Sequence, residues 1–287
     1  MSYSTLDNPS GTCLGSDHEI DFHDQMSKGT ARGAARPRVS TVVKLRDLLL
    51  LFSAQKQIWG LTELAEELDW DTATTHRLAN ALVEIELLAR LDGESSYQLG
   101  PFALELGSAY LSTMPQRRQI VEAMEALATD TGLTAQLGIL AGDRASIVES
   151  RESDSPLRAA ALLGERLPLH ATAVGKAILA QLGDEEVKAL LPAKLERFTG
   201  QTITERKALI EQLHEVREDG LARVDNELSE GLCALAVAPP AGSYSPEISS
   251  LTCAGPSPAI VPESWREAEG RLRVVGKRFA AETGAEA

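Results

Sequence analysis

Between Leu61 and Ile85, two runs of apolar residues with helical spacing stand three residues apart, and this feature constrains the fold more than any other. Apolar side chains share one face in each run: Leu61, Leu64, Ala65 and Leu68 in the first, and Leu78, Ala81, Leu82 and Ile85 in the second. The segment between them, Asp69-Trp70-Asp71, is polar, and Asp71 is suited to cap a second helix over residues 72–84. Two short amphipathic helices joined by so tight a turn predict a helix-turn-helix.

The segments on either side extend this motif. Upstream of Gly60, four apolar residues with helical spacing predict a first helix over residues 41–54: Leu45, Leu48, Leu49 and Phe52. Downstream, two short apolar runs over residues 87–91 and 96–99 flank the turn Asp92-Gly93-Glu94-Ser95. Because Asp-Gly favours the tight turns that join antiparallel strands, we expect a β-hairpin there. Three helices followed by a hairpin predict a winged helix-turn-helix domain over residues 39–100.

Polar side chains gather at the start of the expected third helix, opposite its apolar face. They are Thr72, Thr74, Thr75, His76, Arg77 and Asn80, and the expected wing adds Arg90. Such side chains bind base edges and phosphates when a helix lies in the major groove, so we expect them to contact double-stranded DNA. The alternative is a winged helix that binds another protein and keeps these residues solvated. Four acidic neighbours, which would repel phosphate, favour that alternative: Asp69, Asp71, Glu84 and Glu86.

Net charge does not decide between these alternatives. The chain has a formal charge of −14, but a DNA-binding face is local and the rest of the surface can be acidic. Six basic residues and no Asp or Glu lie between Lys28 and Arg46: Lys28, Arg32, Arg36, Arg38, Lys44 and Arg46. This island is either a phosphate-contacting arm or a solvated basic tail. Residues 1–38 lack hydrophobic periodicity, and we expect them to form a disordered N-terminal extension.

The length of the chain, 287 residues, predicts a second domain. Pro101 opens a helical pattern that Pro115 ends, and this predicts a linker helix within residues 101–116. Beyond it, residues 117–287 mix expected helices (118–131, 172–181, a short one after Asp184, 205–219 and 263–283) with expected strands (134–141, 145–150, 222–226 and 232–238). Because helices and strands do not alternate regularly, we expect an α+β sensor domain.

Several classes of protein are disfavoured by the composition. No apolar run is long enough to span a bilayer and no signal peptide is visible, so we expect a cytoplasmic protein without membrane contact. The three cysteines, Cys13, Cys233 and Cys253, lack metal-ligand spacing and form no disulfide framework. A catalytic set of His170, Asp225 and Cys233 is conceivable, as is a metal site made of His170, His214 and Cys233. A Cys in an apolar strand is more often a small hydrophobic residue, however, so we expect neither an enzyme nor a metal or other cofactor.

Several segments resemble the IclR family of transcriptional regulators. Residues 61–68, 74–78 and 97–101 resemble its DNA-binding domain. The stretch Glu165-Arg-Leu-Pro-Leu-His-Ala-Thr-Ala-Val-Gly-Lys-Ala-Ile-Leu-Ala180 is similar to the family's most recognisable sequence, and residues 220–227 and 231–233 match a further block. The resemblance runs from about residue 41 to 284 in the right order and spacing.

This resemblance implies an α+β protein with an N-terminal winged helix-turn-helix domain and a C-terminal GAF-like effector-binding domain. It implies a homodimer or a dimer of dimers, in which a small organic acid controls binding to the operator of catabolic genes. The ligand cradle implied by the family comprises Thr172, Ala173, Val174 and Gly175, faced by Asp225, Cys233 or Ala234, Thr252 and Ala254. Independently of the family, the free amides and dipole at a helix N-terminus suit a carboxylate.

The sequence departs from the family at three places. Asp69 stands where the turn usually has Gly, but Asp tolerates a left-handed backbone better than most residues. Ala73 replaces a common Ser and removes one expected phosphate contact. The strand end Thr252-Cys253-Ala254-Gly255 has a methyl group in place of one hydroxyl, so we expect a more apolar acid than glyoxylate or pyruvate.

Overall fold

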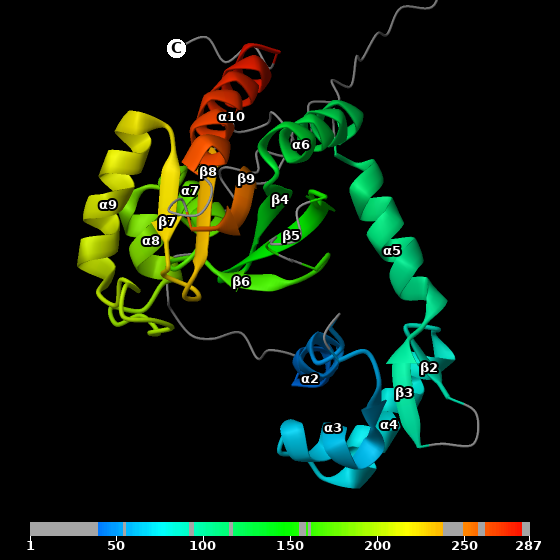
Figure 1. Cartoon of the computed structure of the whole chain (residues 1–287). Coiled ribbons are helices and arrows are strands. Elements are labelled where there is room, and N and C mark those ends of the chain that lie inside the picture. The colour runs from blue at the N-terminus through cyan, green and yellow to red at the C-terminus, as the bar shows by residue number, and fades with distance from the viewer. Residues whose placement is uncertain are drawn as a thin grey trace, which may run out of the picture. The chain divides into compact units, whose positions relative to one another are not determined.

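The computed structural model describes residues 40–53, 56–91, 95–114, 117–154, 159, 162–237, 249–257 and 262–282 (Figure 1). The expected N-terminal extension over residues 1–38 lies outside the described residues, and with it four of the six basic residues from Lys28 to Arg46. The tip of the expected hairpin, residues 92–94, and the expected helix stop at Pro115 also lie outside them.

A winged helix-turn-helix forms the N-terminal part of the described chain. Its helices are α2 (Ser40–Leu50), α3 (Leu61–Glu67) and α4 (Thr72–Glu84). Its antiparallel sheet has the order β1-β3-β2, with β1 (Trp59–Gly60), β2 (Leu88–Arg90) and β3 (Ser96–Leu99). The expected hairpin is therefore confirmed, and the short β1 strand was not foreseen. Helix α2 ends at Leu50 and not at residue 54, because the amides of Leu51 and Phe52 close a tighter turn on carbonyls three residues back.

The turn between α3 and α4 follows the expected chemistry. Asp69 has a φ of 51°, the left-handed conformation in which the family usually has Gly. Asp71 caps α4, since its carboxylate accepts a hydrogen bond of 2.7 Å from the Thr74 amide. Both predictions are confirmed. The two helices then bury Leu64 and Leu82 in a common core with the β3 residue Tyr97, which is fully buried.

Helix α5 (Pro101–Ser112) begins directly after the wing. Gly100 is its N-cap residue and Pro101 its first residue, a position where the missing N–H costs nothing. None of its residues is buried within the chain. Near its C-terminal end, Tyr110 and Leu111 pack against the core of the second domain together with Met114.

The second domain is built on a six-stranded antiparallel sheet of order β6-β5-β4-β9-β8-β7. The strands are β4 (Thr134–Ala141), β5 (Arg144–Arg151), β6 (Arg166–Pro168), β7 (Ala222–Asp225), β8 (Leu232–Val237) and β9 (Ser249–Pro256). Strand β9 was not assigned from sequence pattern, because it is central and buried on both faces and so shows no polar alternation. Strand β6 was missed because it is only three residues long.

Helices cover both faces of this sheet (Figure 1). Helices α6 (Arg117–Thr131) and α10 (Pro262–Glu282) pack on one face, while α7 (Ala173–Ala180) packs on the other. Helix α9 (Arg206–Asp219) packs on α7, and α8 (Asp184–Leu190) packs on α9. The mixed, irregular order of helices and strands confirms the expected α+β class.

Strand alternation decides which side chains each face receives. On β8 and β9, the odd-numbered Cys233, Leu235 and Cys253 belong to the core under α6 and α10. Even-numbered side chains such as Ala236 on β8 and Val224 on the neighbouring β7 instead pack on α7. Within the described part of the chain, no helix is long and apolar enough to cross a membrane.

Candidate functional site

The start of α4 presents most of the polar residues expected to contact DNA. Thr72, His76 and Arg77 are exposed, while Thr74 and Asn80 are partly exposed. Thr75 is a correction, because its side chain is fully buried and its hydroxyl donates a 3.1 Å hydrogen bond to the Asp71 carbonyl. The helical period turns this residue toward the core and its neighbours toward solvent.

Arg90 links the wing to α4. Its guanidinium donates a 2.9 Å hydrogen bond to the hydroxyl of Tyr97 and a 3.3 Å bond to the side-chain oxygen of Asn80. The same nitrogen lies 3.3 Å from Nε2 of His76, and the Asn80 amide lies 3.2 Å from that ring nitrogen. The buried Tyr97 therefore anchors a cluster that holds Arg90 over the exposed face of α4.

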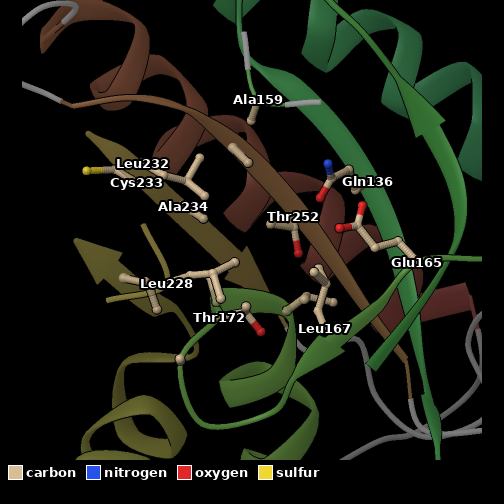
Figure 2. A pocket seen from close by; sticks show the side chains of 15 residues that line it. Gln136, Ala159, Glu165, Leu167, Thr172, Leu228, Leu232, Cys233, Ala234 and Thr252 are labelled. Carbon is tan, nitrogen blue, oxygen red and sulfur yellow. The ribbon is translucent and has the colours of Figure 1, made fainter. Parts of the chain in front are cut away.

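A pocket lies between α7 and the sheet of the second domain (Figure 2). The empty space within it is about 570 Å³, a figure that includes space open to solvent. Most of its lining is apolar: Ala159, Leu167, Ala171, Ala173, Val174, Val224, Leu228, Leu232, Ala234 and Ala254. Four polar side chains complete the lining: Gln136, Glu165, Thr172 and Thr252. Among the described residues, no Lys, Arg or His lines the pocket.

The N-terminus of α7 forms one wall of this pocket. The Thr172 hydroxyl caps the helix by accepting a 3.1 Å hydrogen bond from the Gly175 amide. Because the first amides of a helix have no partner within the helix, those of Ala173 and Val174 are the donors left for an anionic group.

Seven of the expected cradle residues line the pocket: Thr172, Ala173, Val174, Cys233, Ala234, Thr252 and Ala254. Gly175 does not, because it faces the chain at Leu169. A Cβ added at Gly175 would overlap the Leu169 backbone, so this glycine serves the close approach of α7 to that segment.

Asp225 is a further correction, because it does not line the pocket, whereas Cys233 lines it without directing its sulfur into it. Cys233 borders the pocket, but its sulfur points away from it (Figure 2) and lies 2.9 Å from a carboxylate oxygen of Asp225. The two residues are register partners on β7 and β8, so strand alternation directs both side chains to the α10 face. Burial, with the Asp225 carboxylate, raises the pKa of the Cys233 thiol to about 12. This thiol is therefore not a nucleophile.

The pocket also contains two polar residues that sequence reasoning missed, Gln136 and Glu165. Gln136 and Thr252 are register partners on β4 and β9, and both are buried. Glu165 reaches the pocket from the turn before β6. A glutamine inside the otherwise apolar strand 134–141 was an available signal for Gln136. No local pattern marks Glu165, because only the pairing of β6 with β5 brings it to the pocket.

Known proteins resemble the chain over both parts of this structure. Residues 41–92 match the IclR helix-turn-helix domain, and residues 108–241 match the C-terminal domain of bacterial IclR transcriptional regulators. The HTH-type transcriptional regulator Rv1719 of Mycobacterium tuberculosis is 32% identical over 201 residues, which are 69% of this chain and 75% of that protein. The chain belongs to the IclR family. Proteins of this family are transcriptional regulators and not enzymes.

Solved IclR-family structures share the fold. That of an IclR-type regulator from Silicibacter sp. TM1040 has a TM-score of 0.74 and 28% identity, covering 86% of this chain and 97% of its own. An IclR homologue from Microbacterium hydrocarbonoxydans, solved in complex with 4-hydroxybenzoate, has a TM-score of 0.71 and 20% identity, covering 86% of this chain and 100% of its own.

The residues considered for other chemistry in this IclR-family chain each have a separate partner. His170 bonds the Glu196 carbonyl at 2.8 Å, and His214 lies 2.9 Å from the Asp184 carboxylate. Cys233 bonds Asp225 as described. Because both histidines bond elsewhere, these contacts assemble neither the conceivable catalytic set of His170, Asp225 and Cys233 nor the conceivable metal set of His170, His214 and Cys233. Ala73, the other family departure, is exposed at the head of α4.

Proposed function

We propose that this IclR-family regulator binds an operator through α4 and the wing, and that a small organic acid in the α7 pocket modulates this binding. The regulated genes are those of a catabolic operon. The observation that carries the proposal is a recognition helix with exposed polar residues in the same chain as a largely apolar small-molecule pocket.

The DNA-contacting set is smaller than the sequence suggested. Without the buried Thr75, it consists of Thr72, Thr74, His76, Arg77, Asn80 and Arg90. The exposed residues at the N-terminal end of α4 suit base edges in the major groove. Arg90, which Tyr97 already holds, suits a phosphate or the minor groove beside it.

The effector is an acid with a substantial apolar body. Apolar side chains dominate the pocket, and the first amides of α7 supply donors for a carboxylate. The Microbacterium hydrocarbonoxydans homologue was solved with an aromatic acid, 4-hydroxybenzoate, which belongs to the same chemical class.

The active form is a homodimer or a dimer of dimers. Helix α5 has no buried residue, and Leu104 and Leu106 on it are 73% and 49% exposed. Apolar side chains at that density on a helix favour contact with a second copy of the chain. Effector binding then shifts the relative placement of the two DNA-binding domains through α5, so that the half-site spacing matches in one state only.

The test is binding of the full chain to DNA from the intergenic region beside its own gene, at low and moderate salt. We expect sequence-selective, salt-sensitive binding. Arg77→Ala should weaken it about tenfold and reduce the salt dependence by about one counterion. Arg118→Ala is the matched control, because Arg118 is an exposed arginine on α6, outside the proposed contact set.

Equal binding to operator and random DNA, with Arg77→Ala indistinguishable from the unmodified protein, would contradict the proposal. Binding to a protein partner that salt does not weaken would then favour the alternative in which the winged helix is a protein-binding module.

A further inference from the structure

A ligand with two carboxylates would need a positively charged or hydrogen-bond-donating side chain for its second carboxylate, and the described pocket lining has no positively charged one. That lining includes the carboxylate of Glu165, which points toward Gln136 (Figure 2). A second carboxylate placed beside Glu165 in this apolar surrounding would be repelled. The acid group of a ligand must therefore lie elsewhere, and the α7 amides are where the pocket offers donors.

Glu165 is only partly satisfied by the protein. Its Oε2 atom accepts a 3.0 Å hydrogen bond from the Leu162 amide. The described residues supply no further hydrogen bond to this carboxylate, which lines the pocket, so Oε1 remains as an acceptor for a ligand. A carboxylate oxygen can only accept, so the group that satisfies Oε1 must be a donor.

Thr252 adds an independent observation. Its side chain is 2% exposed, it lines the pocket, and its hydroxyl oxygen has no hydrogen-bond partner among the described residues. Buried hydroxyl groups are normally bonded, because an unpaired one loses its interactions with water without replacement. This hydroxyl can both donate and accept, and it lies across the β4–β9 pairing from the buried Gln136. The pocket therefore has a polar end made of Gln136, Glu165 and Thr252.

We infer that the effector carries a hydroxyl group that this polar end binds, with Glu165 accepting its hydrogen and Thr252 or Gln136 bonding its oxygen. The ligand class is a hydroxylated mono-acid with an apolar body, held by its carboxylate at α7 and by its hydroxyl at Glu165. Glu165 is thus the specificity-determining residue, since it accepts a hydroxyl and rejects a second carboxylate. This inference rests on the proposed function, because it describes the ligand of the same pocket.

The test measures binding of matched probes to the full chain by isothermal titration calorimetry. One series is benzoate, 4-hydroxybenzoate, 4-methoxybenzoate and terephthalate; the other is hexanoate, 6-hydroxyhexanoate and adipate. Within a series, we expect the hydroxylated probe to bind on the order of tenfold to hundredfold more tightly than the ether, unsubstituted or di-acid probes, as is typical of a charge-assisted hydrogen bond.

Two variants assign this preference to Glu165. Glu165→Leu should abolish the preference for the hydroxyl, since it removes the acceptor. Glu165→Gln should reduce the preference and admit the di-acids, since it removes the charge and keeps the size. Glu218→Gln is the control, because Glu218 is exposed on α9 and does not line the pocket. Thermal unfolding of each variant checks that it is folded.

Three results would overturn the inference: a di-acid or ether that binds the unmodified protein as tightly as its hydroxylated partner, a preference that Glu165→Leu leaves intact, or no binding of either hydroxylated probe at millimolar concentration. These three results concern ligand binding alone and say nothing about operator binding in the absence of an effector. Sequence-selective DNA binding by the same preparation would therefore keep the proposed regulator function while the hydroxyl-ligand inference fails.

Discussion

Lys176 and Glu227 form an ion pair that the fold has removed from water. Lys176 lies in α7, its side chain is fully buried, and its ammonium group bonds a carboxylate oxygen of Glu227. Burial lowers the pKa of Lys176, while the adjacent Glu227 carboxylate opposes that shift. The other oxygen of Glu227 is buried and has no partner in the part of the chain that the structure describes, so the carboxylate depends on the lysine. Removing one partner of a buried ion pair strongly destabilises the fold, whereas the complete pair contributes little net stability.

Lys176→Met is therefore expected to destabilise the second domain by about 3–5 kcal/mol, because it leaves the Glu227 carboxylate buried and uncompensated. The double variant Lys176→Met/Glu227→Leu should recover most of this loss. Urea unfolding of the two variants and the unmodified protein measures the difference. A double variant no more stable than Lys176→Met alone would contradict this account of the pair.

The two described cysteines are expected to be chemically inert in the folded protein. Burial raises the pKa of both Cys233 and Cys253 to about 12. At pH 8 roughly one thiol in ten thousand is then ionised, and the thiolate is the species that reacts. Iodoacetamide should label both residues in urea-unfolded protein and neither in folded protein within the same time, as peptide mass spectrometry can show. Rapid labelling of folded Cys233 would contradict the burial described here.

At the scale of elements, the start of α4 depends on its cap. Hydrogen bonds from Thr74 lower the pKa of Asp71, so the charged form of this carboxylate is favoured in the folded state. A carboxyl whose folded pKa is lowered stabilises the protein above its unfolded pKa, near 4, and loses that contribution as the pH falls through the folded value. Capping of the recognition helix should therefore weaken in acid.

Asp71→Ala should lower the Tm of the winged helix by a few degrees at pH 7. Asp71→Asn should stay near the unmodified protein, because asparagine caps almost equally well without a charge. Differential scanning calorimetry at pH 7 and pH 3.5 measures both, and the effect of Asp71→Ala should shrink at the lower pH. An effect of equal size at the two pH values would argue against the charged cap.

The position of α7 depends on Gly175, which lets the helix approach the backbone at Leu169 closely. Because a Cβ at this position would overlap the backbone of Leu169, Gly175→Ala must move α7 or the segment before it. Overpacking of this kind costs about 1–3 kcal/mol and would displace the pocket wall. We expect a lower Tm together with weaker binding of any pocket ligand. Gly270→Ala is the control, since a Cβ at that α10 glycine meets no atom within 4 Å.

At the scale of the whole molecule, helix α5 is an element on which the single chain leaves apolar side chains exposed, with Leu104 73% and Leu106 49% exposed. Leu104→Glu should therefore shift the protein toward monomer, with a rise of at least about tenfold in the dimer dissociation constant. Sedimentation velocity over a concentration series measures this. Ser112→Glu is the control, because it adds the same charge seven residues from Glu105, on the face that already carries a carboxylate. Equal dissociation constants for both variants would exclude α5 from the interface.

The sequence alone determined the elements whose patterns are local. The α3–α4 turn, the Asp71 cap, the tolerance of Asp69 for a left-handed backbone and the hairpin all depend on residues a few positions apart, and all are found in the structure. The stretch 165–180, through its resemblance to the IclR family, likewise predicted one wall of the pocket.

Only the tertiary structure decided which side chains meet. It directs Thr75 into the core, sends Asp225 and Cys233 to the α10 face, and brings Glu165 into the pocket. A strand carries its side chains to alternate faces, so one position along the chain changes the face that a residue serves. The face and the partner are set by pairing between distant strands such as β4 and β9, and that pairing has no local pattern from which it could be predicted.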